Sequence, residues 1–131
     1  MKLIVAGSRE FENYAVVERA IDQFIENYGP ITEIVSGTAR GADQLGERYA
    51  KKHNIALRQF PANWDLYGKS AGYRRNEEMA NYGNALLAFW DGLSRGTMHM
   101  RDLAIARHLL VVVQPVKLKA SEHLINTAVN I

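Results

Sequence analysis

Four short segments of the chain combine glycine with serine, threonine, arginine and aspartate, the residue types from which phosphate and sugar sites are built. Glycine lets backbone N–H groups approach an anion, and the rigid fork of arginine matches the geometry of phosphate. Hydroxyl groups add hydrogen bonds, and a carboxylate can accept them from a ribose. Together they predict a site for a mononucleotide-sized anion. The four segments span residues 7–9, 36–43, 68–76 and 91–97.

The first two segments each follow an apolar run that predicts a buried strand. Gly7-Ser8-Arg9 offers a tight turn, a hydroxyl and a guanidinium, a combination that is common in loops and weak by itself. In 36–43, Gly37 and Gly41 allow a loop that folds over a ligand, and the helix start behind it has free N–H donors. Asp43 has two interpretations of equal weight: binding of a ribose hydroxyl, or stabilisation of the helix start.

The third segment contains Gly68-Lys69-Ser70, which resembles the end of a phosphate-binding P-loop. That motif needs a glycine five residues before Gly68, where the chain has Asn63, so a P-loop is not predicted. We expect Arg74, Arg75 and Asn76 to open the next helix. Positive side chains at a helix start are mildly unfavourable because they oppose the helix dipole. Their presence there slightly favours a role in ligand binding.

The fourth segment follows the most apolar strand, where Gly96-Thr97 at a helix start predicts a phosphate cradle. Asp91 could take a ribose hydroxyl or cap the turn. Trp64 could stack on a base, whereas Trp90 is expected in the core. Sixteen residues are predicted to bind the nucleotide: Gly7, Ser8, Arg9, Ser36, Gly37, Ala39, Arg40, Gly41, Asp43, Arg75, Asn76, Asp91, Ser94, Arg95, Gly96 and Thr97.

Strands alternating with helices are expected to position these segments. The strands are predicted at 2–6, 31–35, 55–60, 85–90 and 109–114; helices follow after Asn13 and over 42–53, 73–82 and 96–108, and 61–72 is predicted to be a loop. This order predicts an α/β fold with a parallel sheet of about five strands and helices on both faces. Its strand-to-helix loops then meet at one edge. The domain is predicted to span 1–115, and the tail 116–131 has a weak helical pattern that could dock, join a partner chain or fray.

Composition narrows the classes of protein. A length of 131 residues suits one domain, and 47% hydrophobic with 23% charged residues excludes a disordered tail or a membrane protein. The absence of cysteine excludes disulfides, thiolate metal sites and cysteine nucleophiles, and the four histidines lack metal-ligand spacing, so no metal or cofactor is expected. The first apolar stretch is predicted to be a strand rather than a signal peptide, which indicates a cytoplasmic protein.

In this order the segments resemble the YspA/cpYpsA-related branch of the SLOG superfamily over roughly residues 1–115. The resemblance implies a Rossmann-like three-layer sandwich that binds a nucleotide or a nucleotide-derived small molecule. The matching residues are Gly7-Ser8-Arg9-x-Phe11, Ser36-Gly37-x-Ala39-x-Gly41-Ala42-Asp43-x-x-Gly46-Glu47-x-Tyr49-Ala50, Pro61-Ala62-x-Trp64, Gly68-Lys69-x-Ala71-Gly72-x-x-Arg75-Asn76-x-x-Met79 and Trp90-Asp91-Gly92-x-Ser94-x-Gly96-Thr97.

The related Lonely Guy phosphoribohydrolases cleave a base from a nucleoside monophosphate. Arg75 and Met79 match the spacing of their arginine and methionine, but their glutamate three residues after Gly-Thr is replaced by Met100, which cannot act as an acid or base. N-glycosidic cleavage usually needs a carboxylate nearby. If this chain is an enzyme, its candidate catalytic residues are Asp91, Asp102 and Asp43.

Three hypotheses of function follow, in order of preference. The first is binding of an ADP-ribose-like or phosphoribosyl compound as a sensor or carrier. The second is a phosphoribohydrolase-like hydrolase, which leaves enzymatic activity open. The third is single-stranded DNA binding, by resemblance to the related DNA-processing protein A, and a net charge of only +2 argues against it. The expected partners are a small nucleotide ligand and a second copy in a homodimer, without a membrane.

Overall fold

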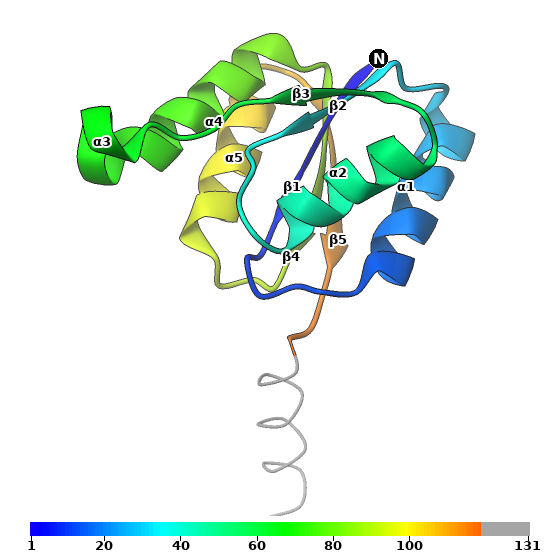
Figure 1. The fold of residues 1–131 in the computed structure, drawn as a ribbon. Helices are drawn as coiled ribbons and strands as arrows, with labels where there is room; N and C mark the ends of the chain where they lie inside the picture. The colour runs from blue at the N-terminus through cyan, green and yellow to red at the C-terminus, as the bar shows by residue number, and fades with distance from the viewer. Residues whose placement is uncertain (119–131) are drawn as a thin grey trace, which may run out of the picture.

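The computed structural model describes residues 1–118 and has a five-stranded, all-parallel sheet in the order β3-β2-β1-β4-β5 (Figure 1). The direction in which strands are added therefore reverses between β1 and β4, which lie side by side at the centre. The predicted α/β sheet of five parallel strands is confirmed. The strands are β1 (Lys2–Gly7), β2 (Glu33–Ser36), β3 (Ala56–Gln59), β4 (Ala85–Trp90) and β5 (Leu110–Pro115).

Helices cover both faces of the sheet and make a three-layer sandwich. Alternate residues of β1 separate the two cores: Leu3 packs on one side and Ile4 on the other, both fully buried. The first core contains α1 and α2 residues and the second contains α4 and α5 residues. The helices are α1 (Tyr14–Tyr28), α2 (Ala42–Lys52), α3 (Trp64–Tyr67), α4 (Ala71–Tyr82) and α5 (Arg95–Ala106).

Local signals set the helix ends much as the sequence predicts. The side chain of Asn13 caps α1 by accepting a hydrogen bond from the N–H of Val16 at 3.3 Å. The helix ends at Gly29, whose φ of 100° suits glycine, and Pro30 follows. Between these caps, every third or fourth residue of α1 is buried against the sheet, as in Val17 and Ile21.

The segment predicted as a loop over 61–72 is instead largely helical. After Pro61, the short helix α3 and the 3-10 turn η1 (Gly68–Ser70) lead directly into α4, which begins at Ala71 rather than Tyr73. Polar and glycine-rich composition suggested a loop, but Asn63 caps α3 by accepting from the N–H of Leu66 at 3.0 Å. The Gly-Lys-Ser triplet thus joins two helices and does not follow a strand.

The end of the described chain leaves the sheet after β5. The N–H of Val116 donates to the carbonyl of Trp90 at 3.0 Å, and Val116 and Leu118 pack against the first core. The predicted tail helix lies largely in 119–131, outside the described residues. Within 1–118, none of the helices has the length and apolar content that crossing a membrane would require.

Candidate functional site

A cavity of about 470 Å³ opens beyond the carboxyl ends of β1, β2 and β3. This is the edge of a parallel sheet where ligands bind in α/β folds. Three arginines and one tryptophan contribute to its wall. The lining residues are Arg9, Gly37, Thr38, Ala39, Arg40, Pro61, Ala62, Trp64 and Arg75.

Close backbone packing brings the β1 turn against the start of α2. The N–H of Ala42 donates to the carbonyl of Ser8 at 3.2 Å. Gly41 has a φ of 79°, and a side-chain carbon placed there would lie 2.6 Å from the carbonyl oxygen of Arg9. Only glycine permits this approach, because any other residue would meet backbone that cannot move aside. The contact places Arg9 beside the loop that carries Arg40.

The loop between β2 and α2 is held in a strained conformation. Thr38 is a β-branched residue with a φ of 66°, in the left-handed region that such residues rarely adopt. Its N–H donates to the Ser36 hydroxyl at 3.0 Å, and that hydroxyl donates to Glu47 on α2 at 2.7 Å. The buried Ser36 therefore holds the loop in place together with Glu47, and Thr38 lines the cavity.

Behind the loop, the buried side chains of Asp43 and Arg75 bring opposite charges close to Gly37. The Asp43 carboxylate accepts from the N–H of Ala39 at 3.1 Å, and the Arg75 guanidinium donates to the carbonyl of Gly37. A side-chain carbon on Gly37 would lie 2.7 Å from Arg75 Nη1 and 2.9 Å from Asp43 Oδ2, so both groups converge on this glycine.

Burial changes the protonation of both groups. It raises the pKa of Asp43 to about 7, against the Ala39 N–H and the charges of Arg75 and Arg9, which favour the ionised form. Burial also lowers the pKa of Arg75, which Asp43 opposes. A carboxyl that titrates near neutral pH behind a cavity can hold or release a proton there.

Asn76 joins the cavity side of the molecule to α5. Its carbonyl oxygen accepts from Arg75 Nε at 3.0 Å, and its amide nitrogen lies 3.3 Å from the carbonyl oxygen of Gly96. The same amide nitrogen lies 3.1 Å from His99 Nδ1. Burial lowers the pKa of His99, which keeps the ring neutral and able to accept this hydrogen bond. Asn76 thus orients Arg75 without lining the cavity.

The loop between β4 and α5 uses its polar groups on itself. Asp91 accepts from the N–H groups of Leu93 and Ser94, both at 2.9 Å. Ser94 caps α5 by accepting from the N–H of Thr97 at 3.4 Å, and the two hydroxyls lie 3.0 Å apart. The turn-capping interpretation of Asp91 therefore describes its contacts in this structure.

The structure places the sixteen predicted binding residues in three groups. Five line the cavity and six lie directly behind them, whereas Asp91, Ser94, Arg95, Gly96 and Thr97 are absent from its lining. Of the candidate catalytic carboxylates, Asp43 lies behind the cavity, and Asp102 is exposed and pairs with Arg101 at 3.0 Å. The cavity-lining residues are Arg9, Gly37, Ala39, Arg40 and Arg75, and those behind are Gly7, Ser8, Ser36, Gly41, Asp43 and Asn76.

Four lining residues are outside the sixteen predicted ones, and of these only Trp64 was considered, as a residue that could stack on a base; they are Thr38, Pro61, Ala62 and Trp64. Thr38 lies inside the glycine-rich segment but carries no signal that distinguishes it from its neighbours. Pro61 and Ala62 belong to the Pro-Ala-x-Trp motif, and its place at the end of β3 was the available signal. The prediction gave most weight to loops after β1, β2 and β4, and β3 supplies the contribution expected of β4.

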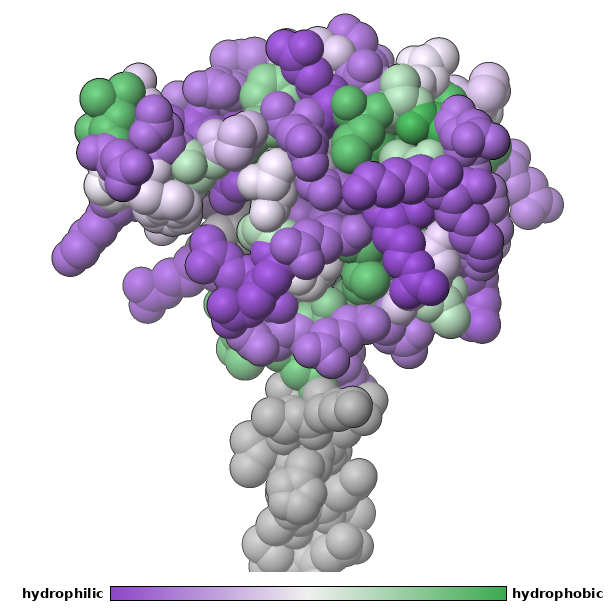
Figure 2. All heavy atoms as spheres, viewed as in Figure 1, coloured by the Kyte–Doolittle hydropathy of each residue, from purple (hydrophilic) through white to green (hydrophobic). Residues whose placement is uncertain are grey.

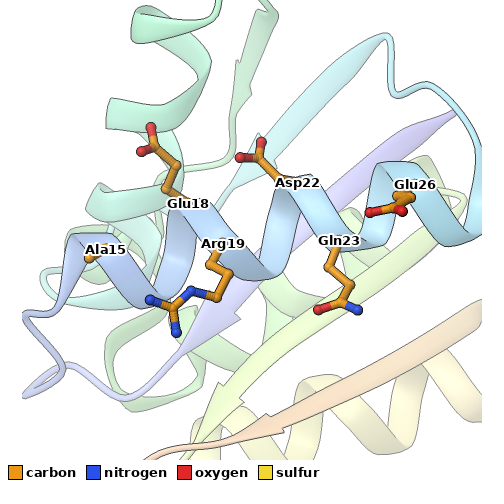
Figure 3. A pocket seen from close by; sticks show the side chains of 6 residues that line it. All are labelled: Ala15, Glu18, Arg19, Asp22, Gln23 and Glu26. Atoms are coloured by element: carbon orange, nitrogen blue, oxygen red, sulfur yellow. The ribbon is translucent and has the colours of Figure 1, made fainter.

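A second hollow runs along the outer face of α1 (Figure 3). Figure 3 shows Glu18 and Asp22 on one side of the helix and Arg19 and Gln23 on the other. Three donors already reach Glu18, from Tyr14, Lys52 and His53, and hold its pKa down at about 2; the Tyr49 hydroxyl donates to Asp22. Glu18 and Asp22 thus join α1 to α2, and the contacts that they make within the protein occupy these two carboxylates.

Comparison with known proteins identifies the family of the chain. The model of the YspA, cpYpsA-related SLOG family matches residues 1–67, which include β1, the β2–α2 loop and the Pro-Ala-x-Trp motif. The chain belongs to this SLOG family. The predicted resemblance is thereby confirmed. The SLOG chain is also 34% identical over 110 residues to the Gene 61 protein of Mycobacterium phage D29, covering 77% of this chain and 86% of the phage protein.

The solved structure of DNA processing protein A from Streptococcus pneumoniae has the same fold. It superposes with a TM-score of 0.68 at 20% sequence identity, over 96% of the SLOG chain. The SLOG chain spans 56% of the length of that protein. At this identity the likeness concerns the fold, and it confirms the Rossmann-like architecture.

Proposed function

We propose that this SLOG chain binds a nucleotide or nucleotide-derived small molecule in the 470 Å³ cavity, as a sensor or carrier. The ligand class is an ADP-ribose-like or phosphoribosyl compound. The observation that carries the proposal is the convergence of Arg9, Arg40 and Arg75 on one cavity at the carboxyl edge of the sheet. The cavity volume falls within the range of small-molecule sites, and arginine is the side chain best suited to phosphate.

The three arginines are not equally available to a ligand. Among residues 1–118, Arg9 makes no hydrogen bond or ion pair, and its side chain is exposed. Arg40 pairs with Glu10, but both side chains are more than 60% exposed, so a phosphate can replace the carboxylate at little cost. Arg75 is committed to Gly37 and Asn76. Arg9 and Arg40 are therefore the proposed phosphate ligands, and Arg75 shapes the cavity.

The start of α2 completes the proposed anion site. Gly41 stands at its N-cap and gives no side-chain hydrogen bond. The N–H of Ala42 already donates to Ser8, so it is the N–H groups after Ala42 in the first turn of α2 that are left for other acceptors. Residues 91–97 are assigned a supporting role, through the contact of Gly96 with Asn76.

The proposal is tested by thermal unfolding with AMP, ADP, ADP-ribose, NAD and ribose 5-phosphate. A ligand at about a hundred times its dissociation constant adds roughly 2.7 kcal/mol to the free energy of unfolding, a clear rise in the midpoint. We expect a rise with at least one compound, lost in Arg9→Ala and kept in Arg95→Ala, because Arg95 is exposed outside the cavity lining. A rise only with a single-stranded oligonucleotide would replace the proposal with nucleic-acid binding.

One observation favours a second candidate, hydrolysis of the N-glycosidic bond of a nucleoside monophosphate. Burial raises the pKa of Asp43 to about 7, so this carboxyl, which lies behind the cavity wall, is the candidate acid that would protonate a departing base while water adds to the sugar. Free base released from AMP by the wild type and not by Asp43→Asn would support this reaction. Release that persists in Asp43→Asn would remove Asp43 from it.

A further inference from the structure

Trp64 differs from Trp90 because its indole makes no hydrogen bond or cation–π contact among residues 1–118. Trp90 donates its indole N–H to the carbonyl of Ser94 at 3.0 Å and lies under the guanidinium of Arg101 at 4.7 Å. Trp64 is 51% exposed, and its indole makes no hydrogen bond with any residue in 1–118. Its ring nevertheless lines the cavity.

The fold supports Trp64 at this position from both sides. The helix α3 that carries it is capped by Asn63 and ends at Gly68, whose φ of 55° suits glycine. A side-chain carbon on Gly72 would lie 3.4 Å from Trp64 Cη2 and 3.8 Å from Arg75 Nη2. Gly72 thus adds no side chain beside the indole or the Arg75 guanidinium, and Trp64 and Arg75 both line the cavity.

Figure 2 shows hydrophobic surface at the end of the molecule that α3 forms. Leu66 is 66% exposed there and Tyr67 is 41% exposed, with Arg74 stacked on Tyr67 at 4.3 Å. Only Trp64 of these three apolar residues lines the cavity. A role of Trp64 in ligand binding can therefore be distinguished from the general exposure of apolar side chains on α3. Leu66, which is exposed on the same helix but outside the cavity, serves as the matched control.

We propose that Trp64 is a base-stacking residue that makes the cavity select compounds with an aromatic base over bare sugar phosphates. This inference rests on the proposed nucleotide-binding function and narrows its ligand class. Every nucleobase has a π-face, and a base stacked on an aromatic side chain gains binding free energy whatever its identity. Arg9 and Arg40 then hold the phosphate, and the base covers the exposed indole.

The test is calorimetric titration of the full chain with two probes, AMP and ribose 5-phosphate, which differ in the base. In Trp64→Ala we expect AMP affinity to fall about ten- to a hundredfold and ribose 5-phosphate affinity to change less than about twofold. Trp64→Phe keeps a stacking ring, so most of the AMP affinity should remain. Leu66→Ala should bind both probes as the wild type does.

Tryptophan fluorescence gives a second readout, which would not change if Trp64 had only a structural role. AMP should quench the tryptophan fluorescence of the wild type, and the quenching should be much smaller in Trp64→Phe although that variant still binds AMP. An equal fall of both affinities in Trp64→Ala, or unchanged AMP affinity, would overturn the role of Trp64 and leave the proposed function standing. A wild type that binds neither probe would overturn both.

Discussion

The loops after β2 and β4 have similar compositions, but they differ in how the helix that follows each loop begins. Both contain serine, threonine, glycine and arginine before a helix, and both have an aspartate within the same segment. After β4, Ser94 and Asp91 take the free N–H groups of the turn and of α5. After β2, Gly41 leaves α2 without a side-chain cap, and the loop lines a cavity. Composition alone does not reveal a ligand site; what matters here is whether a side chain of the loop already caps the helix that follows it.

The largest expected difference between the two loops comes from adding one methyl group to each. Gly41→Ala places a carbon 2.6 Å from the Arg9 carbonyl at a φ of 79°, and we expect the free energy of unfolding to fall by about 3 kcal/mol or more. Gly96→Ala meets nothing within 4 Å and lies inside α5, so its stability should stay the same or rise by up to about 1 kcal/mol. Urea unfolding of both variants measures this difference. Equal effects would break the comparison.

Adjacent arginines on α4 offer the next test. Arg75→Ala removes a buried donor to Gly37 and the positive charge that favours the ionised form of Asp43, so we expect a loss of about 2–3 kcal/mol in stability. Ligand binding should be lost with it because the loop loses its anchor. Arg74 is exposed and stacks on Tyr67, and Arg74→Ala should cost less than about 1 kcal/mol. Similar losses from both variants would contradict the assigned role of Arg75.

Asp43, which lies behind the cavity, makes the free energy of unfolding depend on pH. Its pKa rises from 3.8 in the unfolded chain to about 7 in the fold, so the folded state holds an extra proton between these values. The stability it contributes is complete below pH 3.8 and is lost as pH rises through about 7. At pH 8, Asp43→Asn should therefore be more stable than the wild type by at least about 1 kcal/mol. Denaturation curves at pH 5 and 8 that shift in parallel for both proteins would be inconsistent with this.

The smallest effect is expected from the loop between β4 and α5, in which Ser94 caps the helix. Ser94→Ala removes the α5 cap and should cost about 1 kcal/mol of unfolding free energy. AMP affinity should be unchanged, because Ser94 does not line the cavity. Calorimetry on Ser94→Ala beside Arg9→Ala checks this, and an equal loss of affinity in the two variants would assign residues 91–97 to the ligand after all.

Parts of the site could be predicted because short-range rules fix them. Glycine and polar residues directly after β1 and β2 had to lie at one edge once the strands are parallel. The same rule places the loop after β4 at that edge, but it says nothing about hydrogen bonds inside the loop, so Gly96 and Thr97 were assigned to a ligand they do not face in the cavity. The segment 61–72 was missed because α3 depends on one cap and two short turns that composition does not distinguish from a loop.

The sequence by itself determined the alternation of strands and helices, the helix caps at Asn13 and Gly29, and the family, because these depend on residues close together in the chain. Only the tertiary structure decided that Arg75 reaches Gly37, 38 residues away, and that it also donates to Asn76. It also decided that Asp43 is buried, which sets its pKa, and that Trp64 faces the cavity. Burial and the distances between groups far apart in the chain arise from packing, and no local pattern of residues encodes them.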